Sequence, residues 1–126
     1  MVQRKSDLLQ GILDDFRDKT SDTLIAMVTT KDGLSVASTR EDSIASEEDA
    51  LAVAASQISS MTRDINNQLN QGEIGRILIE GSTRTTIVSN AGRDTLFIVV
   101  VQADAKLGLT MLAISNAVQS IAKVYN

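Results

Sequence analysis

The run Leu-Phe-Ile-Val-Val-Val at Leu96–Val101 is the feature that most limits what this chain can form. A strand with apolar side chains on both faces must be covered on both faces, because neither side can be left to water. The run therefore predicts a central strand over Thr95–Gln102, with helices packed on each side. A chain of 126 residues is long enough for one ordinary domain, so we expect a single domain over residues 1–126.

Three segments carry apolar residues at helical spacing: Val2–Lys19, Ser46–Asn70 and Leu107–Tyr125. The middle segment is the longest, and Gly72 follows it as a typical helix end. We expect its apolar seam to face the sheet, with its other residues turned outward. The residues of this seam are Leu51, Ala54, Ile58, Met61, Ile65 and Leu69.

Five segments are rich in β-favouring residues and are separated by turn sequences such as Asp32-Gly33 and Gly81-Ser82. The expected strands are Leu24–Thr30, Leu34–Ser38, Ile74–Glu80, Thr83–Ser89 and Thr95–Gln102. The order of elements is then α-β-β-α-β-β-β-α. This order predicts the α/β class, as a three-layer α/β/α sandwich around a five-stranded antiparallel sheet.

The residues that are missing limit the chemistry of the chain. It has no Cys and no His, so thiolate chemistry, zinc knuckles and the commonest general base are excluded. Its net charge of −4 argues against nucleic-acid binding, which needs clustered positive charge. The acidic clusters at Asp14–Asp15, Glu41–Asp42 and Glu47–Asp49 are explained by solvated faces and helix starts. We expect a non-enzymatic protein with no catalytic residue, no cofactor and no metal.

Nucleotide hydrolysis by the chain itself is not expected, because the phosphate-loop pattern G-x-x-x-x-G-K-[ST] is absent from the sequence. The glycines of Gly72-Glu73-Ile74-Gly75 are better interpreted as a helix end and a strand entry. Arg63 and Arg84 are candidates for an arginine donated to a partner's active site. An ordinary surface arginine is the simpler interpretation of each.

The sequence shows no membrane-spanning run of about 18 apolar residues, and Met1–Asp7 lacks the apolar core of a signal peptide. We therefore expect a cytoplasmic protein without membrane insertion.

Two features suggest that the chain binds a copy of itself. The outward side of the middle helix is mostly small and uncharged after its first turn, which favours the packing of another helix over mere tolerance of small residues. The strand Ile74–Glu80 exposes unpaired backbone groups if it lies at a sheet edge, unless a loop covers it. In antiparallel self-pairing its two charges, Arg76 and Glu80, face each other. The predicted dimer interface comprises Ala55, Ser59, Thr62, Ile74, Arg76, Ile77, Ile79 and Glu80.

Several motifs in this order resemble the roadblock/dynein light-chain family. They are Lys31–Ser38, the Ala-rich helix opening Ala50–Ala55, Ile77–Gly81, Asn90-Ala91-Gly92 followed by Leu96–Val101, and Asp104–Leu109. The resemblance extends from about Leu8 to Val124 and is closest to the single-domain prokaryotic type, which is MglB-like.

The resemblance implies a dimer in which the third strands pair into one continuous sheet and the second helices lie side by side. It also implies a small Ras-like GTPase as partner, which the chain would regulate by moving the switch loops of the GTPase rather than by donating a catalytic group. We expect the partner to meet the outward face of the paired helices. The residues predicted for this surface are Ser56, Ser60, Arg63 and Asn67.

Two other functions remain open from the sequence. One is a structural, light-chain-like subunit of a larger complex. The other is a sensor of a small ligand, which would require a sizeable pocket with convergent polar groups.

Overall fold

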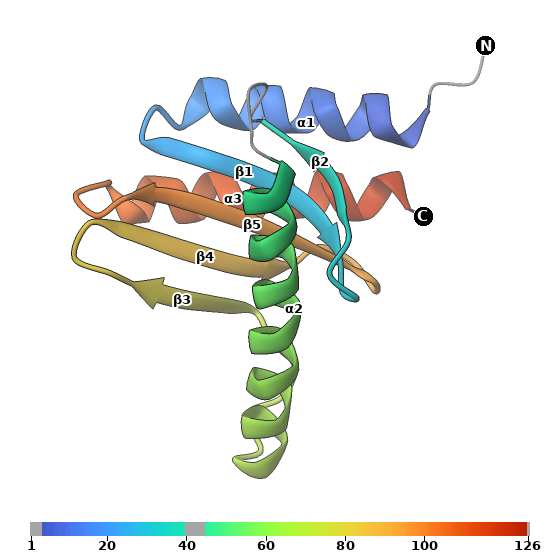
Figure 1. The fold of residues 1–126 in the computed structure, drawn as a ribbon, viewed down its shortest axis with the longest axis vertical. Coiled ribbons are helices and arrows are strands. Elements are labelled where there is room, and N and C mark those ends of the chain that lie inside the picture. The colour runs from blue at the N-terminus through green and yellow to red at the C-terminus, as the bar shows by residue number, and fades with distance from the viewer. Residues whose placement is uncertain (1–3, 40–44, 126) are drawn as a thin grey trace.

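The computed structural model describes residues 4–39 and 45–125, and the predicted order of elements is confirmed (Figure 1). The expected helix start at Val2 and the acids Glu41–Asp42 lie outside the described residues. The elements are α1 (Lys5–Lys19), β1 (Thr23–Thr30), β2 (Ser35–Ser38), α2 (Ala45–Gln68), β3 (Arg76–Glu80), β4 (Arg84–Asn90), β5 (Thr95–Gln102) and α3 (Leu107–Val124).

The five strands form one antiparallel sheet in the order β2-β1-β5-β4-β3. The apolar run of β5 lies in the middle, and every residue from Thr95 to Val101 is buried. Its side chains alternate between two cores, with Phe97, Val99 and Val101 in one and Leu96 and Ile98 in the other. The prediction of a central strand covered on both faces is confirmed.

α1 and α3 lie side by side over one face of the sheet, and α2 crosses the opposite face (Figure 1). The larger core lies under α1 and α3, where Leu9, Leu13 and Ile121 have no exposed surface. Phe16 and Phe97 meet there edge to face, with their ring centroids 5.1 Å apart. This face is closed by the chain's own helices, and the three-layer sandwich is confirmed.

α2 meets the sheet through small side chains, in contrast to the seam that we predicted. Among the residues of α2 whose side chains the structure describes, Ala52, Ala55 and Ser59 are buried, and the two alanines belong to the smaller core with Met27. Small residues are needed because the helix runs close to the β1–β2 turn. A Cβ added to Gly33 in that turn would lie 3.3 Å from the Cα of Val53 in α2.

The predicted sheet-facing seam is therefore wrong for the second half of α2. Met61, Ile65 and Leu69 have exposed fractions of 63%, 50% and 62%. The reason is visible in Figure 1, where the C-terminal half of α2 extends past β3 and beyond the sheet. Among the described residues, no strand lies beneath the seam there (Figure 1).

α3 is long and apolar enough, by length and composition, to cross a membrane. In this fold it packs on α1 and the sheet, and Thr110, Ile114, Ala117 and Ile121 are buried along its inner side. The larger core thus accounts for the inner side of α3, whereas Leu109 and Leu112 on its outer side are exposed.

Candidate protein interface

β3 forms one edge of the sheet and pairs with β4 alone among the described strands. Ile77 and Ile79 point to the same face of the sheet, but only Ile77 packs against the smaller core; Ile79 is 41% exposed, and Leu78, on the other face, is 42% exposed. An apolar edge with free N–H and C=O groups is a template for pairing with another strand. The charged ends of this edge are Arg76 and Glu80, both exposed.

The exposed side of α2 carries an apolar stripe formed by Ala54, Ile58, Met61, Ile65 and Leu69. The first four are spaced by four, three and four residues, which is the spacing of a helix that packs along another helix. An exposed stripe of this length next to a free strand edge marks an interaction surface rather than a solvated one.

The sheet face beneath α2 is covered at one end only. The strand register aligns Met27, Ile98, Val88 and Ile77 in one row across this face, and the first three have at most 2% of their surface exposed. Two positions away along the strands, the next row contains Ile25, Val100, Thr86 and Ile79. In this second row only Val100 is buried. The chain's own α2 leaves this row partly open.

The structure divides the residues predicted for the dimer interface into two groups. Ala55 and Ser59 are buried inside the chain, and the half-buried Thr62 donates its hydroxyl to the Ile58 carbonyl at 2.7 Å. The interpretation of Ala55 and Ser59 as an outward flank is therefore wrong, because the small face of α2 is the one that packs on the sheet. The assignment of Thr62 to the interface stays a prediction. The other group lies at or beside the β3 edge and comprises Ile74, Arg76, Ile77, Ile79 and Glu80.

Met61, Ile65 and Leu69 were not predicted to lie at the surface. Their four-and-three spacing was present in the sequence, but we assigned it to the chain's own sheet. The excess length of α2, 24 residues against strands of eight or fewer, is the signal that could have found them.

The residues predicted for the GTPase surface lie on the flank of α2 opposite the apolar stripe. The Ser56 hydroxyl donates to the Lys31 carbonyl and so ties α2 to the β1–β2 turn. Ser60 is exposed. Arg63 and Asn67 line a cleft of about 750 Å³ between α2, the α2–β3 loop and the turns after β1 and β4.

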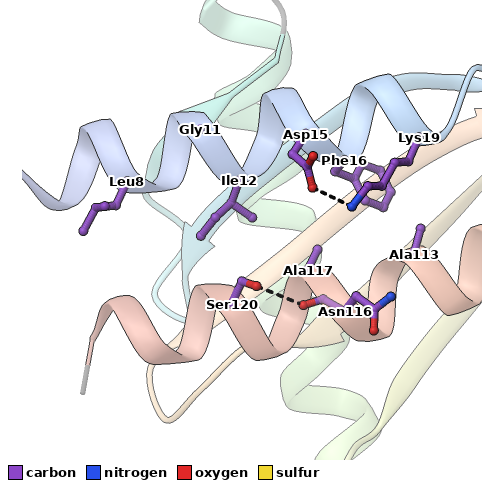
Figure 2. Close-up of a pocket in the computed structure, with 10 residues that line it drawn as sticks. All are labelled: Leu8, Gly11, Ile12, Asp15, Phe16, Lys19, Ala113, Asn116, Ala117 and Ser120. Atoms are coloured by element: carbon purple, nitrogen blue, oxygen red, sulfur yellow. Dashed lines mark hydrogen bonds and ion pairs between the residues drawn. The ribbon is translucent and has the colours of Figure 1, made fainter.

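A second surface hollow lies between α1 and α3, and Figure 2 shows its lining. It has a volume of about 330 Å³ and is opened by the small residues Gly11, Ala113 and Ala117. Asp15 and Lys19 pair across one helical turn at its rim, at 2.9 Å. This hollow lies on the side of the sheet that α1 and α3 cover.

The described part of the chain contains no group of three or more acidic side chains that could hold a metal ion. The site on the α2 side is built from the free edge of β3 and from apolar side chains.

The Roadblock/LC7 domain family matches residues 9–102. The solved structures that share the fold include MglB from Myxococcus xanthus, with a TM-score of 0.87 and 15% identity over 99% of this chain and 92% of that chain. They also include an MglB with a tetrameric arrangement, with a TM-score of 0.86 and 17% identity over 98% of this chain and 92% of that chain. A Roadblock/LC7 domain from Streptomyces avermitilis has a TM-score of 0.85 and 20% identity over 92% of this chain and 96% of that chain. No curated protein matches the sequence.

Proposed function

Because the chain belongs to the Roadblock/LC7 domain family, we propose that it acts as a homodimer that binds a small Ras-like GTPase and regulates or scaffolds it, without catalytic residues of its own. The observation that carries this proposal is the half-covered sheet face beside the β3 edge. The exposed stripe of α2 and the open row on the sheet have the form of one half of an interface between two chains.

In the proposed dimer, the two β3 strands pair antiparallel about a two-fold axis at Leu78. This register places Arg76 of each strand opposite Glu80 of the other, and opposite charges across strands are favourable. Each α2 then extends past its own β3 and over the open row of the other chain. The apolar stripes of the two helices lie against each other and lose their contact with water.

Self-association of this kind is consistent with the tetrameric arrangement of an MglB that shares the fold. In a symmetric dimer each patch occurs twice, so a surface that is too small in one chain is doubled.

The GTPase is proposed to contact the polar flank of the paired helices through Ser60, Arg63 and Asn67. These side chains face away from the apolar stripe and remain accessible after dimerisation. Ser56, which we also predicted for this surface, is held by the β1–β2 turn and contributes to the position of α2. Hydrolysis is left to the partner, because the chain lacks a phosphate loop.

The test is calorimetric titration with a Ras-like GTPase from the same genome, loaded with a GTP analogue or with GDP. The double substitution Ser60→Glu and Arg63→Glu should weaken binding by about tenfold or more, because it reverses the charge of the contact surface. The matched control is Ser6→Glu with Arg4→Glu, which makes the same changes at exposed positions in and just before α1. Equal loss in both variants, or an unchanged affinity in the first, would contradict the proposed surface. Absence of binding by the parent protein would overturn the GTPase assignment.

A further inference from the structure

The cleft of about 750 Å³ beside α2 concentrates positive charge in an acidic chain. Lys31, Arg63 and Arg93 line it, against the single carboxylate of Glu73. None of these four groups forms an ion pair within residues 4–39 and 45–125. The lining therefore carries a net charge of about +2, although the whole chain has a net charge of −4.

The walls of this basic cleft are tied together by hydrogen bonds. The Asn90 side chain donates to the Ile74 carbonyl at 2.8 Å and joins the β4–β5 turn to the α2–β3 loop. The Lys31 N–H donates to the Asp94 carbonyl at 2.9 Å and joins the β1–β2 and β4–β5 turns. The Ser56 hydroxyl donates to the carbonyl of the same lysine, Lys31, and so fixes α2 to the β1–β2 turn. The cleft is thus formed before any ligand arrives, which lowers the ordering cost of binding.

Two glycines keep the rim of the cleft free of side chains. Gly72 and Gly92 have φ angles of +84° and +109°, which other residues rarely adopt. No atom lies within 4 Å of a Cβ added to Gly72, so the space on that side is open.

We infer that the basic cleft binds a small molecule that carries a phosphate group. A phosphate monoester has a charge of about −1.5 to −2, which matches the lining, whereas one carboxylate would neutralise only half of it. The planar guanidinium groups of Arg63 and Arg93 suit phosphate oxygens, and Asn67 offers a further donor. The volume lies in the range of small-molecule sites, which is about 300–1,000 Å³.

The ligand is expected to be recognised through its phosphates rather than through a base. No aromatic side chain lines the cleft in the described part of the chain. Adenine and guanine nucleotides with equal phosphate counts should therefore bind alike. The cationic side of the cleft faces away from the apolar stripe of α2, because Arg63 and Asn67 each follow a stripe residue by two positions, which is about 200° around the helix. Ile74 is the one lining residue that was also predicted for the dimer interface.

The experiment is a titration of the whole protein with pyrophosphate, followed by calorimetry and by amide NMR shifts at constant ionic strength. We expect saturable binding, with shifts at Gly72, Gly92 and Arg93. Lys31→Gln and Arg93→Gln should each weaken binding by about fivefold or more, as loss of a charge-assisted contact does. Glu73→Gln should strengthen it, because the opposing charge is removed.

The matched controls are Arg84→Gln and Lys123→Gln, which remove exposed cations away from the cleft. Their affinities should stay within about twofold of the parent, since distant surface charges are screened. The inference fails if pyrophosphate does not saturate, if the controls lose as much affinity as the cleft variants, or if Glu73→Gln weakens binding in a protein that melts normally. No GTPase is present in this assay, so its failure leaves the proposed GTPase surface untouched.

Discussion

The two faces of the sheet are built to different degrees. Under α1 and α3, the side chains of Leu9, Leu13, Phe97 and Ile121 have no exposed surface, and the single layer formed by these two helices closes the core (Figure 1). Under α2, the rows through Met27 and Ile98 and through Thr29 and Leu96 are closed to a similar extent, whereas the row through Ile25 and Thr86 and the C-terminal half of the helix remain partly open. One chain completes the first core by itself, and in the proposed dimer the second core is completed by another chain.

The largest effect is expected at the closed face. Phe97→Ala removes a fully buried ring that packs edge to face on Phe16. It should lower the free energy of unfolding by about 3–5 kcal/mol, through lost burial and the cavity that remains. Urea denaturation followed by circular dichroism measures this change. A loss below about 1 kcal/mol would show that this core is not the main support of the fold.

The next-largest effect is expected on dimerisation, and it distinguishes the two faces of the sheet most clearly. Met61→Glu with Ile65→Glu places charges on the apolar stripe of α2, and it should convert the dimer to a monomer at tens of micromolar protein. Burying charges without partners at an interface costs several kcal/mol, which corresponds to a dissociation constant raised by about 100-fold or more. Light scattering measures the mass.

The control for this variant is Leu109→Glu with Leu112→Glu on α3, because these leucines are exposed to the same degree, 66% and 62%. They lie on the helix of the closed face, so the mass should remain that of the dimer. Dissociation of both variants would refute the distinction between the faces.

A smaller effect is expected from the charges of β3. Arg76→Glu places like charges opposite each other in the proposed strand pair and should weaken the dimer by about two- to fivefold. The double exchange Arg76→Glu with Glu80→Arg should restore the affinity. Sedimentation equilibrium at low salt, where exposed charges are least screened, measures both. Failure of the double exchange to recover would argue for another register.

An effect of similar small size is expected from buried hydroxyl groups. The Ser59 hydroxyl lies under α2 without a hydrogen-bond partner among the described residues, so Ser59→Ala should be neutral or stabilising by up to about 1 kcal/mol. On the closed side, Thr20 donates to the Phe16 carbonyl at 2.6 Å, and Thr20→Val should cost about 1 kcal/mol. In thermal melts, the melting temperature of Thr20→Val should fall, whereas that of Ser59→Ala should rise or stay unchanged. A destabilised Ser59→Ala would indicate a contact in the assembled protein.

The sequence was sufficient for the fold because its strongest signals are local. Each signal specifies one element or turn by itself. These signals are the unbroken apolar run of β5, the helical spacing of apolar residues in α1 and α3, and the glycines at the turns. Their order then allows few topologies. The central position of β5 follows from its two apolar faces, and the structure confirms it.

The rotation of α2 could not be derived in the same way. Its alanines and its larger apolar residues form two faces, and periodicity alone does not say which face meets the sheet. The close approach of Gly33 decides in favour of the alanines. This approach is a contact between distant segments, which no local pattern encodes. The basic cleft was missed for the same reason, since Lys31, Arg63 and Arg93 are far apart in the sequence.

The most direct test of the account is a cross-link at the proposed two-fold axis. The chain has no cysteine, so Leu78→Cys introduces a single thiol into β3. Opposite residues in antiparallel strands have Cα atoms about 4.5–5.5 Å apart, within the range of a disulfide. Mild oxidation should give a covalent dimer of Leu78→Cys on a non-reducing gel. Val36→Cys, on the opposite edge strand β2, should stay a single chain. Covalent dimers of Val36→Cys to the same extent, or none of Leu78→Cys, would contradict the pairing of β3 across two chains.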